Sequence, residues 1–438
     1  MPKVAVLGGG LAGLAAATAL GSSGYDIDLY ESRAFLGGRA TSWPVGSGDE
    51  AEMVDNCQHV LLRCCVNLLN LYERLGVRDK IRFYRDFCFI EPGGRRSFMQ
   101  RGLLPAPGHF LESFLTLKYL GLADKVAVAR AMNAIPKEWR TRKDLDRITM
   151  LDWLREKRQT ERAIERYWRQ VLVSAINEEL HLMAASHGLQ VFWLGMLARS
   201  DSYEMGVPDV PLRELYDERS LPRTVRIHER SAVTAVEQNH AGIHEIVAGG
   251  EPRNADYYLS CLPFERLKTL MPSLPVAWDE FQHSPITGIH LWFDRPVTDL
   301  PHATLLDRTI QWLYNKRDGR YVQLVVSASR TLTDMSRNEI IELAVRELAE
   351  FFPSASNARL EKAQVIKEVR ATFSARPGLE KLRPLSVTSI SNFFLAGDWT
   401  RSGWPATMEG AVRSGYLAAE AITAAAGAPR RFLLPDIA

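Results

Sequence analysis

Three glycines near the start of the chain constrain its fold more than any other feature. Gly8, Gly10 and Gly13 form a G-x-G-x-x-G pattern between the apolar run 4–7 and an Ala- and Leu-rich stretch over 11–20. The run predicts a buried strand and the stretch predicts a helix. Gly8 allows a tight turn, Gly10 lets the backbone approach a phosphate, and Gly13 lets the helix pack against the strand. The pattern therefore predicts a dinucleotide whose pyrophosphate lies at the helix N-terminus.

An acidic residue ends the next predicted strand. Residues 26–31 alternate in character, and Glu31 lies 23 positions after Gly8. Its carboxylate is expected to accept hydrogen bonds from the ribose hydroxyls of an adenosine. The alternative is a glycine-rich turn in an unrelated α/β unit. The complete order of strand, turn, helix, strand and acidic residue favours the nucleotide site.

The segment from Val4 to Tyr25 carries no charge and superficially resembles a signal peptide or a membrane span. Its six glycines fit a turn better. No other stretch approaches the ~20 apolar residues that a spanning helix needs. We therefore expect a soluble protein, or one that lies on a membrane surface.

Composition excludes several other classes. The net charge is +2, which gives no footprint for nucleic acid. The number of cysteines is odd and no pair has C-x-x-C spacing, so we expect a reducing compartment, no zinc site and no metal. The cysteines are Cys57, Cys64, Cys65, Cys88 and Cys261.

A second glycine motif follows Glu31 directly. Residues 33–39 read Arg-Ala-Phe-Leu-Gly-Gly-Arg. This resembles the second glycine motif of the flavoprotein family that contains amine oxidases and phytoene desaturases. The resemblance implies FAD as cofactor, close approach at Gly37 and Gly38, and a pyrophosphate contact for Arg39, with Arg33 part of the same motif. A surface turn flanked by two solvated arginines is the alternative.

Segments near the C-terminus resemble further motifs of that family. In Phe-Leu-Ala-Gly-Asp at 394–398, the resemblance implies that Gly397 and Asp398 hold the flavin ribityl chain. In Ala-Thr-Met-Glu-Gly-Ala at 406–411, it implies that the backbone at Thr407 and Met408 faces the flavin pyrimidine edge. A helix N-terminus there would stabilise negative charge on the reduced ring.

A middle segment completes the resemblance. Residues 231–237 match the strand whose valine backbone contacts the adenine, and Val233 is the candidate. No second G-x-G-x-x-G is present, so we expect no built-in NAD(P)H site. The predicted fold is α/β, a Rossmann-like FAD-binding domain interleaved with a mixed α+β substrate domain. The FAD-binding domain is assigned to 1–75, 215–270 and 385–438, and the substrate domain to 76–214 and 271–384.

Three segments resemble one group within the family, the squalene-associated FAD-dependent desaturases or hydroxysqualene dehydroxylases. They are 54–65, with Val-Asp-Asn-Cys-Gln-His-Val, 102–109, with Leu-Pro-Ala-Pro, and 397–411. The resemblance implies reduction of hydroxysqualene to squalene in hopanoid and triterpenoid precursor synthesis. Loss of water would give an allylic cation that a hydride from reduced FAD quenches. It also implies a long apolar isoprenoid substrate and an external electron donor.

Three other functions stay open. A carotenoid or phytoene-type desaturase would run the hydride from lipid to oxidised FAD. An amine oxidase is disfavoured because Thr407 replaces the aromatic cage residue, and because Gly288 stands where that family often has a lysine near the flavin. A lipid carrier that binds flavin without turnover is the remaining alternative.

Asp55 and His59 are the candidate catalytic residues, because they lie in the group signature and histidine can protonate a leaving oxygen near neutral pH. The alternatives are a structural hydrogen bond for His59 and a helix N-cap for Asp55. Glu409 is a third candidate acid, and a structural role at the helix start is favoured for it.

Further candidates surround these motifs. Trp399 and Trp404 could wall the substrate tunnel or pack in the core, and Arg401 is more simply a solvated loop cation. An apolar stretch is more simply core than tunnel mouth or membrane contact. It comprises Phe110, Phe114, Leu117, Tyr119 and Leu120. The expected location is the cytoplasm, either free or on the inner face of the cytoplasmic membrane.

Overall fold

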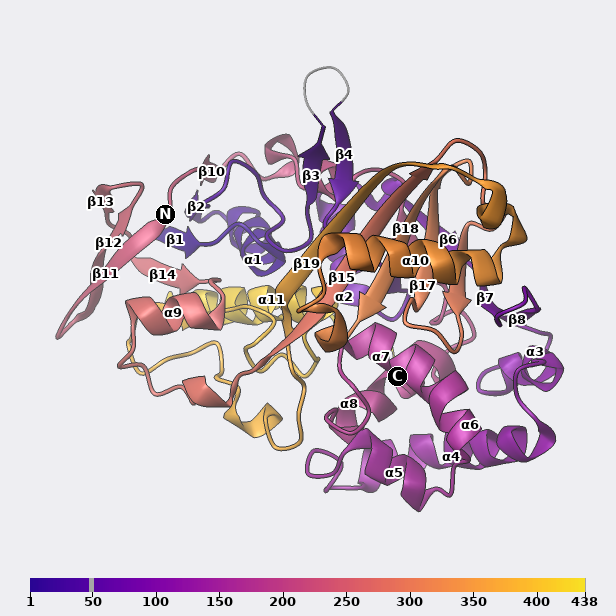
Figure 1. The fold of residues 1–438 in the computed structure, drawn as a ribbon. Helices are drawn as coiled ribbons and strands as arrows, with labels where there is room; N and C mark the ends of the chain where they lie inside the picture. Colours follow the sequence, from indigo (N-terminus) through magenta and orange to yellow (C-terminus); the bar gives the residue numbers. More distant parts are fainter. Residues whose placement is uncertain (47–50, 438) are drawn as a thin grey trace.

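A five-stranded parallel sheet forms one half of the molecule in the computed structural model, which describes residues 1–46 and 51–437 (Figure 1). Every pairing in it is parallel, in the order β10-β2-β1-β14-β20. The strands are β1 (Lys3–Leu7), β2 (Asp26–Tyr30), β10 (Val225–His228), β14 (Tyr257–Ser260) and β20 (Phe393–Leu395). All five come from the three segments assigned to the FAD-binding domain.

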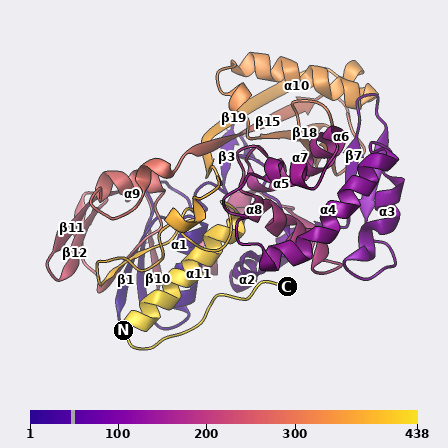
Figure 2. The same ribbon diagram turned by 90° about the horizontal axis from the view of Figure 1, so that it is seen from below.

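Two long helices lie side by side against this sheet (Figure 2). Every residue of α1 (Leu11–Gly21) is buried, and α11 (Met408–Ala425) packs along it. A Cβ at Gly415 would lie 2.2 Å from the Ala12 carbonyl oxygen, so the helices approach closely because Gly415 has no side chain. A helix that is apolar on all sides is either a core helix or a membrane span. The packing of α1 explains why the segment from Val4 to Tyr25 has no charge.

A seven-stranded mixed sheet forms the second half, in the order β19-β15-β18-β17-β16-β7-β8. Its strands are β7 (Asp86–Ile90), β8 (Arg96–Gln100), β15 (His283–Phe293), β16 (His302–Leu305), β17 (Trp312–Arg317), β18 (Tyr321–Ser327) and β19 (Leu360–Phe373). One face packs on α10 (Arg337–Phe351), through residues such as Leu291, Leu313 and Leu324. Because side chains alternate along a strand, their neighbours point to the opposite face, here called the inner face.

Helices cover the lower side of the molecule beneath the inner face (Figures 1 and 2). They are α3 (Leu111–Thr116), α4 (Leu122–Thr141), α5 (Met150–Glu156), α6 (Glu161–Ala163), α7 (Arg169–Ile176) and α8 (Ala185–Gln190). Asn177 and Glu178, after α7, fasten this block to the large sheet. The Asn177 amide donates to the Ser284 carbonyl at 2.9 Å, and Glu178 is fully buried in a two-bond ion pair with Arg330.

Short strands and two more α-helices complete the fold. They are β3 (Ser42–Val45) with β4 (Glu52–Asp55), β5 (Leu61–Leu62) with β9 (Met205–Pro208) and β6 (Ile81–Tyr84), β11 (Val233–Asn239) with β12 (Gly242–Ala248) and β13 (Glu251–Arg253), and helices α2 (Val66–Arg74) and α9 (Phe264–Leu270). The sequence pattern predicts a helix from Val60, but α2 begins at Val66. Residues 61–62 pair with β9 instead, and tertiary pairing overrides the local periodicity. Within the described residues, no helix is both long and apolar enough to cross a bilayer.

Candidate functional site

The first glycine motif forms a cradle at the end of β1. Gly8 has φ +111°, which favours glycine, and its N–H donates to the Tyr30 carbonyl at 2.9 Å. A Cβ at Gly13 would lie 2.0 Å from the Gly8 carbonyl oxygen, so α1 can start here only if residue 13 is glycine. At Gly10 a Cβ would meet only the Gly38 Cα, at 3.8 Å, so the space above Gly10 is open.

Glu31 lies beside this cradle. One carboxylate oxygen accepts from the Gly9 N–H at 2.8 Å, and the other accepts from the Arg33 N–H at 2.9 Å. The Glu31 carbonyl accepts from the Ser231 N–H at 2.7 Å, which brings the start of β11 and Val233 to the same edge. Oε1 of Glu31 also accepts from the Ser32 hydroxyl at 3.0 Å, so Oε2 is the oxygen that keeps acceptor capacity. Ribose contacts by Glu31 and an adenine contact by Val233 stay predictions.

The second glycine motif folds onto the first. Gly37 and Gly38 have positive φ values, and Gly37 donates to the Gly9 carbonyl at 2.9 Å. The Arg33 guanidinium donates to the Gly38 carbonyl at 3.0 Å and braces the loop. Arg39 donates to Asp398 at 2.6 Å and to the Ala371 carbonyl of β19 at 2.7 Å. Arg39 therefore joins the glycine loop, the C-terminal motif and the large sheet, while its predicted pyrophosphate contact remains to be tested.

The C-terminal motif turns back toward the cradle at the start of α11. Gly397 has φ +133° and donates to the Ser414 hydroxyl at 2.8 Å. The Thr407 hydroxyl caps α11 by accepting from the Gly410 N–H at 3.0 Å, and Met408 is the first helical residue. The first N–H groups of a helix have no partner inside it, and they carry partial positive charge. This end of α11 can therefore face an anionic ring edge.

Arg383, which lies outside every sequence motif described above, organises this loop. Its side chain is buried, and its guanidinium donates to the carbonyls of Asp398 at 2.9 Å and Trp404 at 2.7 Å, and also to that of Thr400. Glu380 pairs with it. No local motif marks Arg383, because its partners lie 15–21 positions later in the chain. The signal available was a lone arginine directly before Pro384.

Asp55 and His59 occupy different environments. Asp55 is buried at the end of β4 and accepts from the Ser42 hydroxyl at 2.8 Å, the Leu212 N–H at 2.9 Å and the Lys316 ammonium at 3.2 Å. The helix-cap alternative for the segment after Asn56 is wrong: Asp55 ends a strand, and it holds the start of a 3₁₀ turn at Leu212 instead.

Among the described residues, the His59 ring makes one hydrogen bond. Its Nδ1 lies 2.9 Å from the Cys57 carbonyl, which can only accept, so Nδ1 carries the hydrogen. Burial lowers the pKa of His59, which keeps the ring neutral near pH 7. Nε2 then presents a lone pair. In this state His59 can accept a proton, but it must first be protonated to donate one.

The remaining candidates have structural contacts. Glu409 is buried and accepts from the Leu68 N–H at 2.7 Å and from the Asn67 amide at 2.8 Å, so it holds the start of α2. Burial raises the pKa of Glu409 to about 7. The Trp399 indole donates to the Leu262 carbonyl at 3.0 Å amid a cluster of aromatic rings.

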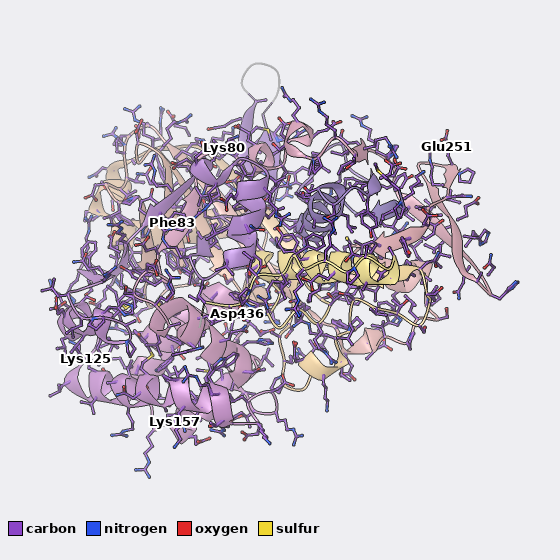
Figure 3. All side chains as sticks on the ribbon, turned by 180° about the vertical axis from the view of Figure 1, so that it is seen from behind. Lys80, Phe83, Lys125, Lys157, Glu251 and Asp436 are labelled. Atoms are coloured by element: carbon purple, nitrogen blue, oxygen red, sulfur yellow. The ribbon has the colours of Figure 1, made fainter. Side chains whose placement is uncertain are left out.

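Arg401, Trp404 and Gly288 can also be compared with their predicted roles. Arg401 is partly exposed rather than fully solvated, because its guanidinium donates to the Glu380 and Lys381 carbonyls. Trp404 is buried, and its indole donates to Asp436 at 3.1 Å, near the chain end visible in Figure 3. At Gly288 a Cβ would lie 2.9 Å from the Asn56 carbonyl oxygen, so this position holds no lysine and has little room for one.

The residues present fit FAD. The open space above Gly10, the acidic residue after β2, the Arg39–Asp398 pair and the helix N-terminus at Thr407 surround one region at the end of the parallel sheet. The family described as flavin containing amine oxidoreductase matches residues 11–423. The chain belongs to that family. It is an FAD-dependent oxidoreductase.

Similar proteins agree with this assignment. A zeta-carotene desaturase of Synechocystis is 28% identical, over 96% of this chain and 97% of the relative. A 15-cis-phytoene desaturase of Synechococcus elongatus is also 28% identical, over 96% of each chain. Among solved structures, a putrescine oxidase has a TM-score of 0.73 at 16% identity, over 97% of this chain and 99% of that one. The likeness to that structure concerns the fold alone.

Proposed function

We propose that this oxidoreductase removes the hydroxyl group of hydroxysqualene to give squalene. The allylic alcohol takes up one proton and one hydride and releases water, so atoms and electrons balance. When bound, reduced FAD supplies the hydride, and an external donor restores the reduced state. The single observation that carries the proposal is the meeting of two of the three segments that resemble the hydroxysqualene group.

These two segments meet through Arg39. The Asn56 amide donates to the Arg39 carbonyl, and the Arg39 guanidinium donates to Asp398. Residues 54–60 and 397–411 thus border the same region in front of the glycine cradle. The Asn56 backbone also lies against Gly288 on the inner face of the large sheet. This face is buried and lined by aromatic rings, including Trp312 and Tyr314, which suits a long apolar substrate and excludes water.

Desaturation is the second candidate. Two relatives that match over 96% of this chain are named as a zeta-carotene desaturase and a 15-cis-phytoene desaturase, and this supports hydride flow from the lipid. A desaturase must also take a proton from the substrate. His59, neutral with a lone pair at Nε2, supports that role more directly than the role of proton donor.

Anaerobic single-turnover reactions separate the two candidates. Reduced protein with hydroxysqualene should yield squalene, detected by mass spectrometry, and in D₂O the product should gain one deuterium at the carbon that bore the hydroxyl. Oxidised protein with zeta-carotene or phytoene should give no desaturated product. Desaturation by oxidised protein without a reductant would replace the proposal with the second candidate.

His59→Ala and Asp55→Asn test the catalytic assignments. Loss of a general acid or base usually slows turnover by ~10²–10⁴. We expect a loss of this size for at least one variant, with FAD content unchanged. Full activity in both variants would remove Asp55 and His59 from the mechanism.

We also propose that the enzyme lies on an anionic membrane surface, but through other residues than the stretch singled out in the sequence. Phe110, Leu117, Tyr119 and Leu120 are buried. The exposed apolar side chains nearby form an apolar corner at the start of α3 and α4. It comprises Leu103, Leu104, Leu111, Leu115, Leu122 and Val126.

Basic side chains border the apolar corner. Arg101, Lys118 and Arg130 are exposed, and Lys125 donates to the Leu115 carbonyl at 2.6 Å, so it ties α4 to α3 at the edge of the helical block (Figure 3). Basic residues around exposed leucines suit anionic lipid headgroups. Leu103→Ser/Leu122→Ser should reduce co-sedimentation with phosphatidylglycerol vesicles, whereas Leu385→Ser/Val387→Ser, exposed elsewhere, should not. Equal binding by both double variants would overturn the proposal.

A further inference from the structure

A row of polar side chains crosses the inner face of the large sheet. His302 on β16, Tyr314 on β17, Gln323 on β18 and His290 on β15 are register partners from strand to strand. Directly opposite residues on adjacent strands have Cβ atoms about 4.5–5.5 Å apart, so the four side chains form a continuous line. The rows on either side are mostly aromatic or apolar, although Thr304 is in register with Trp312 and Arg317 with Tyr321. They contain Trp292 and Tyr321 on one side, and Trp312, Val325 and Gly288 on the other.

Two members of this row have no partner among the described residues. Gln323 is fully buried, and neither its amide oxygen nor its amide nitrogen makes a hydrogen bond. His302 is 2% exposed, and neither ring nitrogen makes one. Each buried polar group left unpaired costs about 1–3 kcal/mol, so a packed core would not be expected to keep four such atoms in one row, on either side of Tyr314.

Gln311, directly before β17, is a buried glutamine whose side-chain amide is fully paired with one backbone residue. Its amide donates to the Ser327 carbonyl at 3.1 Å and accepts from the Ser327 N–H at 2.9 Å. Gln311 therefore has a structural role that Gln323 lacks. The pair offers a comparison in which residue type and burial are the same and only the partners differ.

The row borders a cavity of about 230 Å³. His302 and Tyr314 line it, and the Tyr84 ring contacts the His302 ring edge-on at 4.9 Å. Gln58 lines the cavity from the signature segment next to Cys57. His302 thus lies beside this cavity, at the segment that borders the flavin region, and Gln323 is buried two strands farther along the row.

We propose that Gln323 and His302 form a subsite that binds the hydroxyl group of the substrate alcohol. The amide N–H of Gln323 can donate to the hydroxyl oxygen, and a ring nitrogen of His302 can accept its hydrogen. Burial lowers the pKa of His302 to about 4, so the ring stays neutral and keeps an acceptor. This subsite rests on the proposed function, because a pure hydrocarbon would leave the same four atoms unpaired.

The subsite distinguishes an alcohol from the hydrocarbon formed from it. A site built to hydrogen-bond a hydroxyl rejects an analogue without one by large factors, since its own buried groups are then unpaired. We therefore expect the oxidised holoenzyme to bind hydroxysqualene at least about 10²-fold more tightly than squalene. Because oxidised enzyme does not supply a hydride, the two dissociation constants can be measured without turnover.

The test measures this ratio of dissociation constants in detergent micelles, through the change in flavin absorbance. Gln323→Met should lower the ratio about tenfold or more by weakening hydroxysqualene alone, which corresponds to the loss of one hydrogen bond to a buried group. His302→Phe should lower it in the same direction. Gln311→Met is the matched control and should keep the wild-type ratio. Flavin content and unfolding temperature establish that each variant is folded.

Each outcome decides something. A wild-type ratio near one, an unchanged ratio in Gln323→Met and His302→Phe, or an equal loss in Gln311→Met would overturn the subsite. Selective binding that depends on Gln323 without squalene formation would keep the subsite and refute the dehydroxylation. Squalene formation by Gln323→Met with unchanged kcat and KM would keep the reaction and refute the subsite.

Discussion

The flavin cradle and the inner face of the large sheet are both buried, but they are built from different materials. Backbone groups make the cradle, at turns where glycine is required, and its main contacts connect Gly8–Gly13 with Gly37–Gly38. Side chains make the inner face, and they come from several strands of the large sheet, including β15, β18, β17 and β16. A site of the first kind fixes the cofactor, and a site of the second kind can change its substrate without disturbing that cofactor.

The largest expected effect is in the cradle. Gly13→Ala would place a Cβ 2.0 Å from the Gly8 carbonyl oxygen, against backbone that cannot move without shifting α1. We expect loss of both folding and flavin, seen as insoluble or colourless protein. Gly10→Val is the matched variant, because Gly10 has φ −76° and open space above it. That variant should fold, with native circular dichroism, and lose only the FAD.

Two outcomes in the glycine variants would contradict this description of the cradle. Normal flavin content in Gly10→Val would mean that the space above Gly10 is not the cofactor's. A stable, yellow Gly13→Ala protein would mean that the tight contact between α1 and the Gly8 turn is not required.

A smaller effect is expected for Arg383, which supports the cradle from outside it. Arg383→Met removes a buried guanidinium and leaves the Asp398, Trp404 and Thr400 carbonyls without their donor. Breaking such a buried charged network costs about 3–5 kcal/mol. We expect lower denaturant midpoints and faster loss of FAD on dilution. Arg401→Met is the control, because Arg401 lies in the same loop and donates to two carbonyls. This variant should lose less stability and less FAD than Arg383→Met. Equal losses in the two variants would contradict the special role of Arg383.

The cradle could be predicted from the sequence, and most of the inner face could not. The parallel sheet, the glycine turns and the capped start of α11 at Thr407 are encoded within short segments, so local patterns predict them. Arg383 could not be predicted, because its partners are backbone carbonyls brought near by the fold. The row through His302 and Gln323 was also out of reach, since strand register is set by tertiary pairing. The 110–120 stretch is largely core, as its sequence favoured, but the exposed apolar corner beside it could not be predicted, because hydrophobicity alone does not say which side of a helix is covered.

The next effect concerns pH and Glu409, which links the cradle helix α11 to α2. Burial raises the pKa of Glu409 to about 7 from the usual 4.5. Between these two values the folded chain keeps a proton that the unfolded chain has released, so stability falls as pH rises and then levels off above about 7. The shift corresponds to roughly 3 kcal/mol.

Chemical denaturation at pH 5 and at pH 8 measures this contribution. Glu409→Gln carries no titrating carboxyl at this position and serves as the reference. The free energy of unfolding of the wild type, minus that of Glu409→Gln, should be lower at pH 8 than at pH 5. If the wild type gains stability over Glu409→Gln as pH rises, the hydrogen bonds from Leu68 and Asn67 outweigh burial and the sign is wrong.

The smallest effect concerns the inner face, and its sign is opposite to that in the cradle. Gln323→Met keeps the shape of the side chain and removes two buried polar atoms without partners, so it should stabilise the protein by about 1–2 kcal/mol. Gln311→Met removes two made hydrogen bonds to Ser327 and should destabilise it by a similar amount. Denaturant midpoints of the two variants give the comparison directly. If Gln323→Met is more stable than the wild type and binds the alcohol more weakly, Gln323 is kept for its ligand at the expense of packing. If Gln323→Met and Gln311→Met are both destabilised, Gln323 has protein partners and serves the core.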